Sequence, residues 1–319
     1  MRSEPLVAGV ELGGTKCVCV LASGPDDVRA EVRLPTTTPA ETMVAARAVL
    51  DGWRKGPGFA ALGLASFGPL DLERSSATFG SVVATPKSGW SGADLLTLAV
   101  DAGVPVGIDT DVNGAALAEG LWGATRGLRS FAYITMGTGI GVGSIVDGRA
   151  IRGLGHSEAG HIRIPRAAGD DWPGVCPYHG DCVEGLASGP AIEARAGRPG
   201  DRLTADDPAW DGVVHAMAML LHNLVLTTAP SRILIGGGIG CGQPHLLPRL
   251  RSALIESLAG YSMVTAVAAD IATYLAPPAL GSRAGPLGAI AVALAELEAA
   301  NSVARPSAPA TEHARRRGQ

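Results

Sequence analysis

Residues 6–23 read LVAGVELGGTKCVCVLAS, and this stretch decides the fold class. Two apolar runs flank the pair Gly13 and Gly14, which is the pattern of a β-hairpin with a glycine turn. Residues 130–151, SFAYITMGTGIGVGSIVDGRAI, repeat the order of apolar run, glycine turn and apolar run. The repetition predicts an α/β protein made of two related halves with a cleft between them.

The chain between the two hairpins alternates between strand and helix patterns. Residues 28–34 alternate like a third strand, and the spacing of Met43, Ala46 and Leu50 predicts a helix over 41–55. The order then continues with a buried strand within 59–71, a helix over 93–103, a strand over 104–108, and a loop followed by a helix over 109–123.

The second half holds one long segment without periodicity, residues 152–190, which is polar and rich in glycine. Irregular segments of this length inside a compact protein usually serve function. Further along, the sequence predicts an apolar helix over 213–229, a short buried strand followed by three glycines over 232–240, and a C-terminal helix over 285–300.

The composition is that of a globular protein with a slightly acidic balance. Hydrophobic residues make up 46% and charged residues 18%, with a formal net charge of −4, which argues against wholesale disorder and against a nucleic-acid or membrane partner. No signal-peptide pattern opens the chain, and no run reaches the about 18 apolar residues of a membrane helix. A cytoplasmic protein is expected. Residues 301–319, rich in Pro, Ser and Arg, are predicted to form a disordered tail.

Both glycine turns are candidate phosphate sites. Where no Cβ intervenes, backbone N–H groups approach a phosphate closely. Thr15 and Lys16 add a hydroxyl and a positive charge at the first turn, and residues 137–139, Gly-Thr-Gly, offer the same device in the second half. A two-glycine hairpin is also a common structural turn. Two such turns, with three further glycines at 236–238, favour nucleotide binding. The sequence matches neither a Walker loop nor a Rossmann fingerprint.

Asp111 is the candidate general base. It lies in DTDVNG, residues 109–114, directly after an apolar strand, where ligands of open α/β sheets bind. Phosphoryl transfer to an alcohol needs a carboxylate that accepts the hydroxyl proton. The alternative is that Asp111 only caps a helix that starts near Ala115.

A metal site is predicted around residues 176–182, CPYHGDC. Cys176, His179 and Cys182 stand three residues apart, and His161 lies upstream. Two thiols and two imidazoles make a tetrahedral zinc set, and four protein ligands imply a structural rather than a catalytic metal. A disulfide is disfavoured where glutathione keeps thiols reduced; a chance grouping of surface residues is the other alternative. We assign structural or incidental roles to His156, Cys17, Cys19 and Cys241.

Taken together, these motifs resemble the ROK family of bacterial sugar kinases, and its fructokinase branch in particular. The similarity runs from about residue 6 to residue 300. The motifs that carry it are GVELGGTK (9–16), SFGPLDL (66–72), TPKSGW (85–90), DTDVNGAALAEG (109–120), ITMGTGIGVG (134–143), EAGHI (158–162), CPYHGDCVEGLASGPAIEAR (176–195) and ILIGGGIG (233–240).

The resemblance implies the fold of the sugar kinase, actin and heat-shock ATPase superfamily, which is ribonuclease H-like. Two α/β domains would flank a central cleft. The N-terminal domain would span 1–113 and be completed by the helix at about 285–300. The C-terminal domain would span 114–284 and carry a zinc-binding loop at about 156–190. ATP with transiently bound Mg²⁺, a small-molecule sugar and a second copy of the chain, as a homodimer, are the implied partners.

The resemblance also implies roles for single residues. Asp111 matches the catalytic base and touches the sugar. Glu158, His161 and Glu184 match residues that shape the sugar site, and His161 is shared with the zinc site of Cys176, His179 and Cys182. The implied ATP-binding residues are Glu11, Gly13, Gly14, Thr15, Lys16, Gly137, Thr138, Gly139, Gly189, Pro190, Gly236, Gly237, Gly238, Ile239 and Gly240.

Three positions depart from the common pattern of the family. Glu11 stands where most members have Asp, although the fructokinase branch tolerates Glu. Thr110 stands where glucokinases often have Asn, which argues against glucose as the preferred substrate. His179 stands where many relatives carry a cysteine.

The expected function is ATP-dependent phosphorylation of D-fructose to fructose 6-phosphate. One alternative is a kinase for another hexose: mannose, glucose or an N-acetylhexosamine. A second is a sugar-binding regulator without catalysis, and a third is a zinc module that binds nucleic acid. The intact Asp111 and both glycine turns argue against the second. The acidic composition argues against the third.

Overall fold

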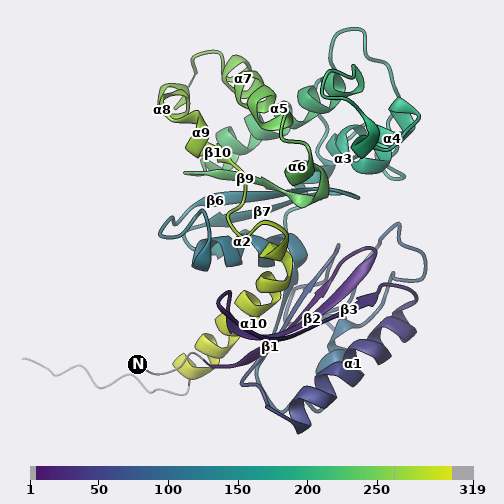
Figure 1. Ribbon diagram of the computed structural model, residues 1–319, viewed down its shortest axis with the longest axis vertical. Coiled ribbons are helices and arrows are strands. Elements are labelled where there is room, and N and C mark those ends of the chain that lie inside the picture. Colours follow the sequence, from purple (N-terminus) through teal and green to yellow (C-terminus); the bar gives the residue numbers. More distant parts are fainter. Residues whose placement is uncertain (1–4, 262, 304–319) are drawn as a thin grey trace, which may run out of the picture.

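The computed structural model describes residues 5–261 and 263–303, and two five-stranded mixed sheets organise them (Figure 1). In the first sheet the strand order is β3-β2-β1-β4-β5, and in the second it is β10-β9-β6-β7-β8. The strands are β1 (Val7–Leu12), β2 (Lys16–Gly24), β3 (Asp27–Pro35), β4 (Leu62–Ser66), β5 (Val106–Thr110), β6 (Phe131–Met136), β7 (Ile140–Val146), β8 (Arg149–Ala150), β9 (Ile233–Gly236) and β10 (Leu275–Ala276).

The two sheets repeat one topology. In each, three strands form an antiparallel meander, and the first strand of the meander then pairs in parallel with the fourth, which pairs in parallel with the fifth. The predicted relation between the halves is therefore confirmed at the level of strand order. The two hairpins quoted above are β1–β2 and β6–β7, and each opens its own sheet.

The helices fill three layers around the sheets (Figure 1). The outer face of the first sheet is covered by α1 (Pro39–Lys55), and the outer face of the second by α5 (Ala209–Thr228) and α7 (Leu246–Leu258). Two helices, α2 (Asp111–Trp122) and α10 (Ala284–Val303), lie between the sheets. From one side of the molecule to the other, the layers are therefore α1, the first sheet, α2 with α10, the second sheet, and α5 with α7.

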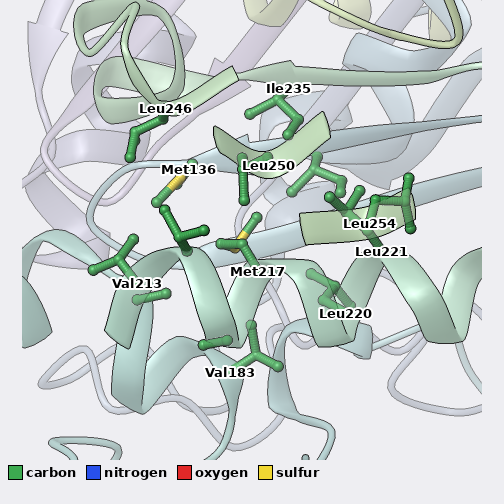
Figure 2. Packing of buried hydrophobic residues seen from close by; sticks show 14 of the residues in the cluster. Met136, Val183, Val213, Met217, Leu220, Leu221, Ile235, Leu246, Leu250 and Leu254 are labelled. Atoms are coloured by element: carbon green, nitrogen blue, oxygen red, sulfur yellow. The ribbon is translucent and has the colours of Figure 1, made fainter. Parts of the chain in front are cut away.

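Strand alternation sends side chains to opposite layers. On β6, Ile134 and Met136 pack with α5, whereas Phe131 and Tyr133 pack with α2 and α10. Figure 2 shows the first of these cores, where Met217 of α5 meets leucines of α7 and Ile235 of β9. By length and composition α5 is the one helix among the described residues that could cross a membrane, but most of its residues are buried in this core.

A row of glycines lets α10 lie directly on the first sheet. Gly9, Gly63 and Gly107 are neighbours across β1, β4 and β5. A Cβ at Gly9 would lie 2.8 Å from Cβ of Ala289, and one at Gly107 would lie 2.8 Å from the carbonyl oxygen of Val292. Because these positions lack side chains, the helix backbone reaches the strand backbone. The helices cross in the same way, since a Cβ at Gly288 would lie 2.5 Å from the backbone of Gly114 in α2.

Several predicted elements differ from the structure. The helix predicted over 93–103 is wrong: only a short 3-10 turn forms, η1 (Leu95–Ala99), with Asp94 as its cap. Four elements were not predicted from the sequence: α7, α8 (Val264–Ala269), α9 (Ile271–Tyr274) and β10. The irregular segment contains η2 (Ala159–His161), α3 (Val183–Ala187) and the start of α4 (Gly189–Ala196). The other short elements are η3 (Gly200–Arg202), α6 (Gly237–Gly242) and η4 (Gly281–Arg283).

The ends of the predicted domains stay predictions. Near the proposed boundary at residues 113 and 114, α2 continues straight from β5 and packs against both β7 and α10. The helix α10 extends to Val303, so residues 301–303 are helical rather than part of a tail. The rest of the predicted tail, 304–319, lies outside the described residues.

Candidate active site and metal centre

The tip of the first hairpin is exposed and is contacted by a lysine from another loop. Gly13 closes the turn by donating its N–H to the carbonyl oxygen of Lys16 at 2.9 Å, and Gly14 and Thr15 are exposed. Nζ of Lys87, on the loop before Trp90, donates to the carbonyl oxygen of Gly14 at 2.6 Å. A bare backbone turn that is contacted by the ammonium of Lys87 and followed directly by Lys16 suits an anion such as a phosphate. Lys87 was not among the predicted site residues.

The other predicted glycine segments meet at one place. The N–H of Gly189 donates to the carbonyl oxygen of Gly137 at 2.7 Å, and a Cβ at Gly137 would lie 3.8 Å from the nitrogen of Gly238. At Gly237 the backbone has φ +82° and a Cβ would lie 2.5 Å from the nitrogen of Met136. The second hairpin, the start of α4 and the start of α6 thus form a cradle of bare backbone, with Ser188 capping α4.

Asp111 is the first residue of α2 rather than its N-cap residue. Thr110 is the cap: its side chain accepts the N–H of Asn113 at 3.2 Å. The helix therefore begins at Asp111 and not near Ala115, so the expectation that Asp111 would be the N-cap residue of a helix starting near Ala115 is wrong. Oδ1 of Asp111 accepts the N–H of Val112 at 2.8 Å. Burial raises the pKa of Asp111 to about 6, which suits a base that works near neutral pH.

Glu11 carries an unpaired carboxylate oxygen next to Asp111. Its Oε2 is buried and has no hydrogen-bond partner among the described residues. Burial, followed by repulsion from Asp111, raises the pKa of Glu11 to about 7. The side chain also faces α10, where a Cβ at Gly285 would collide with Oε1. An orphaned carboxylate oxygen beside a second carboxylate fits the oxygen ligands that Mg²⁺ takes.

Two further carboxylates approach from the second half. Oε2 of Glu184 accepts the N–H of Ile140 at 3.0 Å, just after the second glycine turn. Burial, then repulsion from Glu184 and Asp111, raises the pKa of Glu158 above its usual range. The side chain of Glu158 remains 43% exposed, so water screens part of this repulsion. Glu158 thus lies close enough to Asp111 and Glu184 to be repelled by both, and a raised carboxyl pKa of this kind is common at functional sites.

The four predicted zinc ligands form one cluster. The ligand atoms of His161, Cys176, His179 and Cys182 all lie within 4.8 Å of one another. Nδ1 of His161 is 3.6 Å from Sγ of Cys176 and 3.6 Å from Sγ of Cys182, and Nδ1 of His179 is 3.7 Å from Sγ of Cys176. Tetrahedral zinc with ordinary Zn–S and Zn–N bonds requires sulfur–nitrogen separations of about 3.6 Å. The residues therefore fit a structural zinc ion.

The Cys/His cluster lies beside one of these carboxylates, that of Glu184. Nε2 of His161, the ring nitrogen that faces away from the cysteines, lies 3.7 Å from Oε1 of Glu184. This separation is longer than a hydrogen bond, so the imidazole and the carboxylate are neighbours without a direct bond between them. Because Cys182 also caps α3, which carries Glu184, the cluster sets the position of that glutamate.

Some residues that build the site were missed from the sequence. Behind Asp111, Asp109 accepts Nδ2 of Asn113 at 2.8 Å and pairs with Arg152 at 2.5 Å. The pair lines a small cavity of about 130 Å³, together with Arg74 and Glu296. His156, assigned no role from the sequence, contacts both halves. Such contacts join segments far apart in the chain, so no spacing rule indicates them.

The chain is similar to known proteins over nearly all of its length. The ROK family matches residues 7–296. A fructokinase from Zymomonas mobilis is 39% identical over 305 residues, covering 92% of this chain and 99% of that protein. A fructokinase from Pediococcus pentosaceus is 36% identical over 294 residues, covering 92% and 99%. The crystal structure of a ROK hexokinase from Thermus thermophilus has a TM-score of 0.73 at 28% identity, covering 92% and 99%.

Proposed function

The chain belongs to the ROK family, and on that premise we propose that it is an ATP-dependent hexose kinase whose acceptor is D-fructose and whose product is fructose 6-phosphate. The observation that carries this proposal is Asp111: a carboxylate with a raised pKa at the start of α2, close to the carboxylate of Glu158 in the second half. Two similar proteins named fructokinase, each matched over nearly its whole length, support the choice of sugar.

In the proposed reaction Asp111 takes the proton of the sugar's primary hydroxyl. That oxygen forms a bond to the γ-phosphorus as the bond between the γ-phosphorus and the β,γ-bridging oxygen breaks, and ADP leaves. Backbone N–H groups of the two glycine turns, with Lys16 and Lys87, bind the phosphoryl oxygens as charge moves onto them. Glu11, with its unpartnered carboxylate oxygen, is the residue that would hold Mg²⁺, which when bound neutralises charge on the nucleotide phosphates.

The proposed sugar site lies between the halves. Glu158 and Glu184 accept hydrogen bonds from sugar hydroxyls, and His161 lies beside Glu184 while it binds zinc through Nδ1. The nucleotide lies over the cradle formed by Gly137, Gly189 and Gly238, with its phosphates toward Gly13 and Gly14. In this arrangement the zinc ion is structural: it fixes the loop that carries the sugar ligands.

The test is an ADP-release assay with ATP, Mg²⁺ and a panel of fructose, mannose, glucose, N-acetylglucosamine and N-acetylmannosamine. We expect the highest kcat/KM with fructose. Asp111→Asn should lower kcat by about 10²–10⁴-fold and leave the KM for sugar nearly unchanged, because a general base acts in the transition state. Asp147→Asn, at an exposed position on the β7–β8 turn, is the matched control. Near wild-type turnover in Asp111→Asn would remove that residue from the role, and a different leading sugar would overturn fructose.

We further propose a cytoplasmic homodimer. The support is the resemblance to the family and the reduced thiols that a zinc cluster needs. Light scattering on the zinc-loaded protein tests the dimer, and a monomer mass at micromolar concentration would contradict it.

A further inference from the structure

The side chain of His156 is buried between the two halves of the molecule. Only 4% of it is exposed, although the residues around it, 152–155, are exposed. The ring packs against the loop after β4, where a Cβ at Gly68 would lie 3.2 Å from Cε1 of His156. A buried polar ring in an otherwise exposed loop needs partners for both of its nitrogens.

The first partner fixes the tautomer. The backbone N–H of Leu70, in the first half, donates to Nε2 of His156 at 2.9 Å. Because Nε2 accepts a hydrogen bond, the proton of the neutral ring is on Nδ1. Burial is the main cause that lowers the pKa of His156, so the neutral form predominates at neutral pH. His156 is therefore a neutral ring with an acceptor toward the first half and a donor on the other side.

The second ring nitrogen, Nδ1, faces the backbone carbonyl of Ser157 and a carboxylate of the proposed sugar site. Nδ1 of His156 lies 3.4 Å from Oε1 of Glu158 and 3.4 Å from the carbonyl oxygen of Ser157. Glu158 leaves the rest of its carboxylate open to solvent. The loop itself is held on the first half by a second contact, since Arg152, which pairs with His156 in an isolated β-bridge, forms the ion pair with Asp109.

We propose that His156 is a positioning residue for the acceptor sugar. Its Nδ1–H holds the carboxylate of Glu158 toward the sugar, and its Nε2 ties that orientation to Leu70 in the first half. The inference rests on the proposed function, because it requires Glu158 to bind sugar. It adds that the sugar contact made by the second half depends on the loop after β4 in the first half.

Two substitutions separate the two nitrogens. In His156→Asn the side-chain amide donor takes the place of Nδ1–H, and the acceptor toward Leu70 is lost. In His156→Gln the side-chain oxygen takes the place of Nε2, and the donor toward Glu158 is lost. Since the contact at stake is with a charged carboxylate, we expect His156→Gln to raise the KM for fructose about tenfold. The KM for ATP and kcat should stay within about twofold, and His156→Asn should restore the KM for fructose to within about threefold.

A merely structural role would not distinguish the two variants. Equal KM values for fructose in His156→Asn and His156→Gln would overturn the inference, as would a rise in the KM for ATP of the same size as the rise for fructose. Should the glutamine variant fail to fold, the asparagine variant decides alone: a KM for fructose within about threefold of the wild type supports the inference, and a tenfold rise contradicts it.

Kinetics in a Glu158→Ala background distinguish a failure of the positioning role of His156 from a failure of the proposed function. There, His156→Gln should add no further rise in the KM for fructose, because the group it positions is gone. An additive rise would overturn the positioning role and leave the proposed function intact. If Glu158→Ala alone leaves the KM for fructose unchanged, the proposed sugar site fails, and the role of His156 fails with it.

Discussion

The carbonyl oxygen of Ala289 in α10 occupies the space where a side chain at Gly63 would stand. A Cβ built on Gly63 would overlap that oxygen and would lie 2.6 Å from the nitrogen of Ala293. Gly63 is the middle member of the glycine row on the first sheet. The contact therefore decides how closely α10, and with it Gly285 against Glu11, approaches the site.

Gly63→Ala should lower the free energy of unfolding by about 1–3 kcal/mol or more, because neither the strand nor the helix backbone has room for a methyl group. Chemical denaturation of the two proteins measures the difference. Gly52→Ala is the matched control: that glycine is exposed within α1 and a Cβ there has nothing within 4 Å. It should gain about 0.5–1 kcal/mol. Equal stability of Gly63→Ala and the wild type would show that α10 does not rest on the sheet in this way.

The fold was predictable from the sequence where a short stretch of chain carries the periodic pattern of a strand, a turn or a helix. The two glycine hairpins and the helix over 41–55 follow from patterns within a few turns of chain, and the structure has them. The helix over 93–103 failed because its apolar residues fill the first core as one short turn, with Asp94 accepting the N–H of Leu96. The row of Gly9, Gly63 and Gly107 could not be predicted, because its members belong to three strands and their shared partner, α10, lies near the other end of the described chain.

The buried Glu11 should make stability depend on pH. Its pKa is raised from 4.5 to about 7 in the folded protein, so the folded state holds the proton more tightly than the unfolded state does. The wild type therefore loses stability as pH rises from about 4.5 to 7. Glu11→Gln removes the charge at nearly constant shape, so at pH 8 it should be more stable than the wild type by roughly 3 kcal/mol, and about equal at pH 4.

An exposed glutamate with the opposite shift provides the control for Glu11. Hydrogen bonds from Thr37 and Thr38 hold the pKa of Glu41 below its usual range. The charged form of Glu41 is thus favoured by folding, and Glu41→Gln should lose stability relative to the wild type at pH 8 rather than gain it. Thermal melts at pH 4 and pH 8 measure both variants. A parallel response of the two would contradict the assignment of an unpaired charge to Glu11.

Activity should fall on the acid side of neutrality. Burial raises the pKa of Asp111 to about 6, and the base must be unprotonated to accept a proton. We expect kcat/KM for fructose to fall below pH 6 with an apparent pKa near 6, to which the interacting Glu11 also contributes. Initial rates between pH 5 and pH 8.5 measure the profile. A profile that is flat over this range would exclude a carboxylate base with this environment.

Removal of one proposed zinc ligand should release the metal and loosen the loop that leads into α3 and Glu184. Cys182→Ser should lower bound zinc from about one equivalent to well below it, because cysteine thiolate is the stronger ligand for zinc. The KM for sugar should rise more than the KM for ATP, since Cys182 also begins the helix that carries Glu184. Elemental analysis and kinetics test both statements.

Cys241→Ser is the matched control for the zinc prediction, because that thiol is exposed and lies outside the cluster. It should retain the metal. Wild-type protein that contains no zinc after purification in zinc-replete medium would contradict the metal assignment itself.

For the site, residue chemistry was easier to predict than residue partnership. The thiols and the imidazole of Cys176, His179 and Cys182 predicted a metal site, and the structure brings their ligand atoms together with that of His161. Lys87 and His156 were passed over because each acts through a backbone group of a distant segment, Gly14 or Leu70. A sequence shows which side chains are present, but backbone partners appear only once the halves are in place.

The position of α10 on the first sheet also affects the order of events on the ribosome. The strands of that sheet end at Thr110, whereas α10 begins at Ala284. At about 5–20 residues per second, translation of the intervening segment takes roughly 10–35 s. Throughout that time the glycine face of the first sheet lies uncovered in water. The half that is synthesised first therefore has to wait for α10 before its glycine face is covered. The need for chaperone protection falls on the beginning of the chain.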